Sequence, residues 1–424
     1  MEQWLMDEDG RGDSETSDHA PASSSLNRRQ FLAGSASWLA ISTSPTLFSA
    51  QAEGPNEPID PTRVPGASPG PYGERSSFEK QTRLVASASS TTPLQDLQGI
   101  MTPSALHFER HHNGVPAISP SRHRLLVHGL VGRPMMFTVE ELKRFPSVSR
   151  FAFIECSGNS RDGWDEAQDL TVQHLHGLTS TSEWTGIKLS TLLEAVEISR
   201  EATWMLAEGG DAAALTRSVP LTDEVLNEAM VCYGQNGEAL RPEQGYPLRL
   251  LLPGFEGNIN VKWLRRLKLG SAPFMTRWET ATYTDLMPDG KAYQFSLVME
   301  AKSVITKPSG QQQLRPGFHE IQGLAWSGRG YITAVDVTVD AGRTWQAARL
   351  QEPVLPKCHT RFRLPWRWDG QETIIQSRCT DDTGYRQPTR ESLIKVRGIH
   401  SSYHYNGIQS WKIERNGIVK NVHI

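Results

Sequence analysis

One cysteine lies where an apolar run gives way to a turn, a position from which its side chain could bind a metal. The run at 151–154 (Phe-Ala-Phe-Ile) predicts a buried strand, and the Ser-Gly-Asn-Ser at 157–160, which follows Cys156, is typical of a turn. Soft, redox-active metals select thiolate ligands, and Arg161, five residues after the cysteine, is a cation that favours ionised sulfur. The alternative is that Cys156 is a small buried hydrophobic residue.

Four blocks of the sequence, in order, resemble the sulfite oxidase family of molybdenum enzymes. Residues 155–159 (Glu-Cys-Ser-Gly-Asn) are similar to its Glu-Cys-x-Gly-Asn signature. The other blocks are 108–116, 245–249 with 261–264, and 323–345. The resemblance extends from about residue 100 to about residue 415. It implies a molybdenum–molybdopterin cofactor (Moco), with Cys156 as the one protein ligand to the metal.

The same resemblance implies roles for further residues. Arg110 and Arg161 match arginines that hold an anionic substrate, a task that suits the planar guanidinium group. Tyr283, five residues after Trp278, matches a tyrosine whose hydroxyl donates to the metal's oxygen ligand or to the substrate. The residues that match positions around the pterin and its phosphate are Phe108, Arg110, His112, Arg249 and Lys262. The alternatives are structural salt bridges for the arginines and a core position for the tyrosine.

Several positions depart from the pattern of the sulfite enzymes. Gln244 replaces a histidine, Ile259 replaces an arginine, and Ser160 replaces a common arginine after the cysteine motif. The segment 403–411 lacks the arginine that is usual near the end of those enzymes. Because each change removes a positive or basic group, we expect weaker capture of a free, small dianion than in those enzymes.

With 277–285 and 319–330, the altered ending resembles one branch of the family, the molybdoprotein subunits of sulfane dehydrogenases. That resemblance implies oxidation of sulfane sulfur on a carrier protein, as part of periplasmic thiosulfate oxidation, and electron transfer to a separate c-type cytochrome subunit. One alternative is a sulfite dehydrogenase that acts on free sulfite. Another is a cofactor-free, β-rich binding subunit.

The N-terminus predicts export. Residues 27–32 (Asn-Arg-Arg-Gln-Phe-Leu) have the twin-arginine form, and an A-x-A cleavage site ends at Ala52. We therefore expect a signal peptide over 1–52, folded export to the periplasm and no membrane anchor, since the apolar stretch is too short and too diluted to span a bilayer. Removal of 1–52 leaves 40 acids against 41 Lys and Arg, a near-neutral chain that argues against nucleic-acid binding.

Composition and periodicity divide the remaining chain into three parts. Residues 53–100, rich in Pro, Gly, Ser and Thr, predict a linker or peripheral arm. Residues 101–285 predict an α+β molybdopterin-binding catalytic domain, with helices over 138–145 and 190–196 and a third beginning at Thr222. Residues 286–424 predict an all-β, immunoglobulin-like sandwich, with strands near 332–339, 373–379 and 393–396. By resemblance, this sandwich would form a homodimer.

The cysteine pattern excludes several metal sites. The chain has four cysteines and no CxxCH motif, so we expect no haem on this chain. The lack of paired cysteines likewise argues against zinc and iron–sulfur sites. Cys232 is expected in the core, and Cys358 and Cys379 either form a disulfide or remain free thiols.

Overall fold

The structure is a computed structural model that describes residues 62, 65–66 and 68–424. The predicted signal peptide lies outside the described residues. Residues Arg75–Ile424 form a compact unit, which contains every element discussed below. None of the helices in the described ranges is long and apolar enough to cross a membrane.

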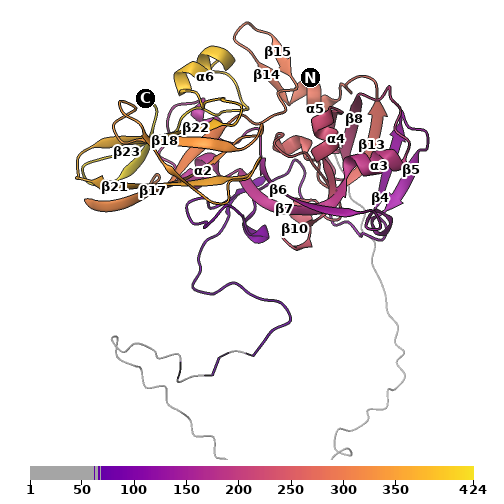
Figure 1. Cartoon of the computed structure of the whole chain (residues 1–424), viewed down its shortest axis with the longest axis horizontal. Coiled ribbons are helices and arrows are strands. Elements are labelled where there is room, and N and C mark those ends of the chain that lie inside the picture. The colour runs from indigo at the N-terminus through magenta and orange to yellow at the C-terminus, as the bar shows by residue number, and fades with distance from the viewer. Residues whose placement is uncertain (1–61, 63–64, 67) are drawn as a thin grey trace, which may run out of the picture. The chain divides into compact units, whose positions relative to one another are not determined.

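The first part of the compact unit is built on two sheets with helices packed between and beside them (Figure 1). One sheet has the order β5-β4-β13-β8-β9, in which only β4 and β13 run parallel. Its strands are β4 (Arg124–Gly129), β5 (Met135–Thr138), β8 (Trp204–Gly209), β9 (Thr216–Pro220) and β13 (Leu264–Gly270). The other has the order β11-β10-β7-β6, with β12 paired to β10. Its strands are β6 (Ser147–Glu155), β7 (Thr179–Lys188), β10 (Met230–Gln235), β11 (Glu238–Ala239) and β12 (Arg249–Leu251).

The three predicted helices of this part, α1, α3 and α4, begin at or next to the predicted residues. Thr138 caps α1 (Val139–Leu142) through a capping box with Glu141, and the Thr222 hydroxyl accepts from Val225 N at the start of α4 (Asp223–Glu228). The other helices are α2 (Val172–His176), α3 (Leu189–Ala195) and α5 (Arg277–Ala281). Buried side chains of α1, α3 and α4 join those of both sheets in one core.

The second part is a sandwich of two antiparallel sheets around a second core, to which β6 and α2 of the first part also contribute side chains. The first sheet consists of β16 (Lys302–Lys307), β17 (Gly317–Trp326), β20 (Arg349–Gln351) and β21 (Thr360–Trp368). The second consists of β18 (Ile332–Thr338), β19 (Gln346–Ala347), β22 (Thr373–Asp381), β23 (Ser410–Ile413) and β24 (Val419–Val422). Between the two parts, β14 (Thr284–Leu286) and β15 (Ala292–Gln294) form a hairpin. The α+β fold followed by a β-sandwich agrees with the prediction.

The strand predicted near 393–396 is wrong, because this segment lies in helix α6 (Arg390–Arg397). The Thr389 hydroxyl accepts from Ser392 N and begins the helix. Leu393 is buried against Trp164 and Tyr405, whereas Val396 is 65% exposed. The apolar residues at 393–396 therefore follow the periodicity of a helix, with Leu393 on its buried side, rather than the alternation of a strand.

The segment predicted as a linker or peripheral arm, 53–100, contains two short strands near its C-terminal end. β1 (Leu84–Ala86) and β2 (Ser89–Thr91) form a hairpin, and β2 pairs with β3 (Glu109–Arg110). Leu94 is fully buried in the sandwich core. The sparse apolar residues of this segment thus pack individually, without a periodicity that sequence reasoning could detect.

Candidate cofactor site

Strand β6 carries Cys156 to its C-terminal end, as predicted. β6 pairs with β7 along its whole length as far as Glu155 and Thr179. Cys156 N then donates to Leu178 O at 3.0 Å, and Asn159 N donates to Cys156 O at 2.8 Å to close a turn. Cys156 is partly exposed, whereas the other three cysteines are buried. All four are free thiols, so Cys358 and Cys379 form no disulfide.

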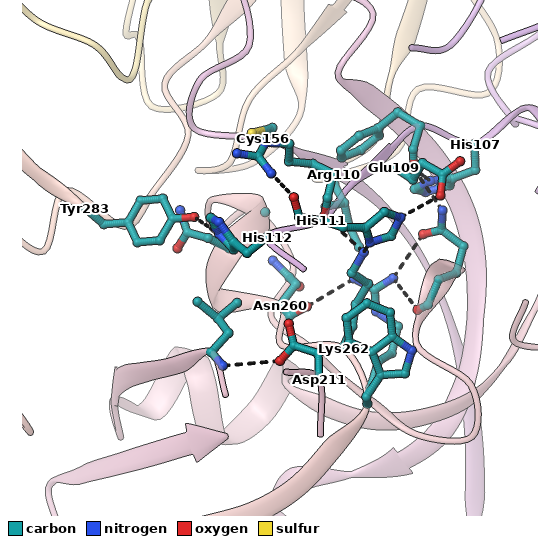
Figure 2. A pocket seen from close by; sticks show the side chains of 18 residues that line it. His107, Glu109, Arg110, His111, His112, Cys156, Asp211, Asn260, Lys262 and Tyr283 are labelled. Atoms are coloured by element: carbon teal, nitrogen blue, oxygen red, sulfur yellow. Dashed lines mark hydrogen bonds and ion pairs between the residues drawn. The ribbon is translucent and has the colours of Figure 1, made fainter. Parts of the chain in front are cut away.

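A pocket beside Cys156 gathers most of the side chains that the sequence singled out (Figure 2). The predicted residues that line it are Phe108, Arg110, His112, Cys156, Arg249, Lys262 and Tyr283. They come from the segment around β3, the end of β6, the start of β12 and the loops before β13 and β14. Arg161 is not among the lining residues and its side chain is exposed.

Two cations, the half-buried Lys262 and the buried Arg249, dominate one side of the pocket. Lys262 Nζ contacts Arg110 O at 3.2 Å, His111 Nδ1 at 2.8 Å and Glu243 O at 3.1 Å. Burial, reinforced by the nearby charge of Arg249, lowers the pKa of Lys262 to about 7. The guanidinium of Arg249 stacks 4.5 Å from the Trp184 ring, and burial lowers its pKa to about 10. An anion in this pocket would stabilise both cations in their charged forms.

Unpaired polar atoms in the pocket wall match the cofactor that the resemblance implies. Arg249 Nε is a buried donor without a partner in the described part of the chain. Two acceptors, His107 Nε2 and Asn258 Oδ1, are likewise buried and unpaired among the described residues. A phosphate would meet the unpaired donor and the cations, and the N–H groups of a pterin ring would meet the acceptors. The residues present therefore fit a molybdopterin.

The thiol of Cys156 is not ionised by its surroundings in the way the sequence suggested. Burial raises its pKa above the ordinary value, and the Gly158 N–H and Arg110 lower it only in part. The cation that acts on this sulfur is thus Arg110 rather than Arg161. A bound metal ion would deprotonate the thiol outright. In the described ranges, no group of three or more His, Cys, Asp and Glu side chains is arranged to hold a metal ion.

Tyr283 lies in the loop between α5 and β14, with its hydroxyl 2.9 Å from His112 Nε2. Burial raises the pKa of Tyr283 strongly, and the charges of Cys156 and Glu256 add to the effect. Burial also lowers the pKa of His112, and the positive charge of Arg110 lowers it further. At neutral pH this pair is therefore a protonated phenol and a neutral imidazole, so that Tyr283 can act as a hydrogen-bond donor.

Among the residues that sequence reasoning did not single out are two histidines of the pocket wall and a tyrosine beside it. His107 and His111 line the pocket on either side of Phe108, and their closeness in sequence to His112 was the available signal. Tyr403 reaches the site from the C-terminal segment: its ring centroid is 5.6 Å from that of Tyr283. Burial and the charge of Cys156 raise the pKa of Tyr403, whereas Arg161 lowers it. Arg161 thus lies on the Tyr403 side, outside the pocket.

The positions that depart from the sulfite enzymes have structural contacts of their own. The Gln244 side chain donates to Phe108 O at 2.8 Å. Ile259 is fully buried in the core. Ser160, with φ at +67°, bonds His176 Nδ1 at 2.7 Å through its hydroxyl. None of these three side chains presents a cation to the pocket.

Family models match two consecutive regions of the chain. The oxidoreductase molybdopterin binding domain matches residues 112–278, and the Mo-co oxidoreductase dimerisation domain matches residues 294–410.

Similarity to individual proteins extends over most of the chain. Chicken (Gallus gallus) sulfite oxidase is 31% identical over 327 residues, covering 71% of this chain and 71% of that protein. Mouse (Mus musculus) mitochondrial sulfite oxidase is 29% identical over 331 residues, or 72% of this chain, and the match spans only 60% of the mouse protein. The crystal structure of the sulfane dehydrogenase SoxCD from Paracoccus pantotrophus matches with a TM-score of 0.81 and 42% identity, covering 90% of this chain and 100% of the matched chain. The fold, the pocket around Cys156 and these similarities together establish that the chain belongs to the sulfite oxidase family of molybdopterin oxidoreductases.

Proposed function

We propose that this protein is a periplasmic, molybdenum-dependent dehydrogenase that oxidises sulfane sulfur bound to a carrier protein and passes the electrons to a c-type cytochrome subunit. The observation that carries the choice of substrate is the neutral set of side chains at 160, 244 and 259, each occupied by structural contacts. A free dianion depends on local cations for its affinity. A substrate that is attached to a protein gains affinity from the protein surface as well.

The lining residues fall into two groups, one that would hold the cofactor and one that would orient the substrate. Lys262, Arg249 and His112 would hold the cofactor, and Cys156 would bind the metal. Arg110 and Tyr283 face the same space and would orient the sulfur-bearing group. When bound, the cofactor supplies two-electron redox chemistry at the metal. For each oxygen atom that the sulfur gains, one water is consumed and two protons and two electrons leave the site.

The remaining parts of the proposal concern assembly and location. The match to a dimerisation domain supports pairing of two copies through the β-sandwich. The similarity to SoxCD supports a cytochrome partner, and the twin-arginine sequence at 27–32 supports periplasmic export. Purification from the native host, followed by a haem stain, should show a c-type cytochrome with this chain. Rapid turnover by the haem-free chain with oxygen as sole acceptor would contradict the partner.

The nearest alternative is a sulfite dehydrogenase, and the identity to chicken sulfite oxidase favours that alternative. An assay with two substrates distinguishes it from the proposal. The purified, molybdenum-loaded protein is assayed with a persulfidated carrier protein and with free sulfite, using the same artificial acceptor. We expect a higher kcat/KM with the carrier protein than with sulfite. A higher kcat/KM for sulfite would overturn the substrate assignment. Lack of molybdenum in protein exported from its native host would instead point to a cofactor-free binding subunit.

A further inference from the structure

A buried ion pair joins the cysteine turn to the β-sandwich. Glu155, the residue before Cys156, is fully buried, and its Oε1 lies 2.6 Å from Lys302 Nζ. Lys302 is 2% exposed and is the first residue of β16. The two residues are far apart in sequence, one ending β6 and the other beginning a strand of the sandwich.

Every oxygen of this carboxylate is engaged. Trp326 Nε1 donates to Glu155 Oε2 at 2.7 Å, and Asn159 Nδ2 donates to Oε1 at 2.9 Å. Lys302 and Trp326 are direct partners across β16 and β17, so the two donors are presented side by side by one sheet. A carboxylate held by three donors in a buried site has little freedom to rotate.

The same contacts fix both ends of the turn that contains Cys156. Asn159 Oδ1 accepts from Leu178 N at 3.1 Å, while Cys156 N donates to Leu178 O at 3.0 Å. Lys302 Nζ also lies 3.3 Å from the hydroxyl of Ser160, at the far end of the turn. The ammonium group therefore touches the turn on both sides of the cysteine.

We propose that Lys302 is a positioning residue for Cys156, through which the β-sandwich sets the orientation of the sulfur. This role rests on the proposed function, in which Cys156 binds the metal. The sandwich would then do more than pair two copies of the chain: it would also hold the turn that carries the metal ligand. Lys302 touches neither substrate nor cofactor, and its effect is transmitted by Glu155.

The chain offers a matched control in Lys357, a second buried lysine of the C-terminal part that reaches into the first part. Its Nζ lies 2.6 Å from both Glu224 Oε1 and Glu228 Oε2 in α4. These side-chain contacts do not involve residues 155–160. Lys357→Met therefore removes a cross-domain lysine without touching the cysteine turn, whereas Lys302→Met removes the contact under study.

The first readout is the alkylation rate of Cys156 by iodoacetamide in the cofactor-free protein, followed by mass spectrometry. The three buried cysteines report any global opening in the same sample. Lys302→Met is expected to raise the rate at Cys156 alone by about tenfold, equivalent to about 1.4 kcal/mol of lost restraint. Lys357→Met should leave that rate at the wild-type value.

A charge-balanced variant keeps the test decisive if Lys302→Met fails to fold. The double change Glu155→Gln with Lys302→Met removes both buried charges and retains an oxygen that can accept from Trp326. It should also accelerate alkylation of Cys156. If this variant folds, as judged by near-ultraviolet circular dichroism, and its Cys156 reacts at the wild-type rate, the proposal is overturned.

The second readout is the electron paramagnetic resonance spectrum of the molybdenum-loaded enzyme after reduction to the paramagnetic Mo(V) state, a spectrum that responds to the orientation of the sulfur ligand. Lys302→Met should shift the spectrum and lower kcat more than it changes KM, and Lys357→Met should do neither. An unchanged spectrum would contradict the positioning role. Cys156→Ser tests the proposed function separately from the role of Lys302. If this variant retains the wild-type spectrum, Cys156 is not the metal ligand, whatever the alkylation rates show.

Discussion

Arg217 allows the sharpest prediction about stability, because it is a fully buried cation between two buried carboxylates. Its Nε lies 2.9 Å from Glu279 Oε1, and its Nη2 lies 3.0 Å from Glu256 Oε1. Both carboxylates are at most 3% exposed. Arg217→Met would keep the apolar volume of the side chain but leave two buried carboxylates without this partner.

The expected loss in the free energy of unfolding can be estimated in two ways. Removing one partner of a buried ion pair typically costs about 3–5 kcal/mol. Burial alone would raise the pKa of Glu256, yet Arg217 and His404 outweigh it and lower that pKa from 4.5 to about 2, which corresponds to about 3 kcal/mol. For the roughly 350 residues of the compact unit, an unfolding entropy of about 2.1 cal/mol/K per residue converts 3–5 kcal/mol into a Tm lower by about 4–7 °C.

Calorimetry of the wild type and of Arg217→Met at pH 7 checks the magnitude. The matched control is Arg133→Met, which breaks an ion pair with Glu197 whose two side chains are 61% and 59% exposed and should change the Tm by about 1 °C or less. The pH dependence has a definite sign. Because the folded pKa of Glu256 lies below its unfolded value, its contribution is present above about pH 4.5 and is lost as the pH falls toward 2. A Tm within 1 °C of the wild type at pH 7, or a difference that widens toward pH 3, would refute this reasoning.

Four further predictions concern the site and export. Cys156→Ser should keep the wild-type Tm and abolish turnover, because a hydroxyl is a harder and weaker ligand than thiolate; turnover near the wild-type rate would contradict the assignment. Since the pKa of Lys262 is about 7, binding of sulfate to the cofactor-free protein should weaken by up to about tenfold per pH unit above 7. Calorimetric titration measures this, and Lys262→Met should bind weakly without that dependence. Arg110→Ala should lower kcat/KM by about one to two orders of magnitude, and by more than Arg161→Ala, since only the first side chain lines the pocket; the reverse order in steady-state kinetics would contradict this ranking. Replacing the arginines at 28–29 by lysines should hold a folded precursor in the cytoplasm, and a normal amount in the periplasmic fraction would refute the twin-arginine prediction.

The parts of the site that could be predicted are those in which local sequence decides local structure. An apolar run followed by a turn was enough to place Cys156 at a strand end, and threonine caps located α1 and α4. The resemblance to a family added the partners of Cys156 across the pocket. Helix α6 was missed because Leu393 to Val396 are compatible with either periodicity, and only packing against Trp164 and Tyr405 decides between them.

The contacts that could not be predicted are those made between distant segments. Glu155 and Lys302, or Arg217 and Glu279, carry no mark in sequence that distinguishes them from surface charges. Tyr403 packs beside Tyr283 from a segment that the hydrogen bond from His404 N to Ser157 O at 2.8 Å ties to the cysteine turn. Arg161 shows the converse: its nearness to Cys156 in sequence does not place it among the residues that line the pocket.

The burial of the three other cysteines has a chemical consequence for an enzyme with the function proposed above. A persulfide readily passes its outer sulfur to any accessible thiolate, so that a stray thiol near the site would act as a trap. Burial raises the pKa of Cys232 and of Cys358 to about 12, and raises that of Cys379 as well. These thiols stay protonated and out of reach at neutral pH. With that function, the protein would handle reactive sulfur without being modified by it, because Cys156, its one partly exposed cysteine, would be bound to the metal.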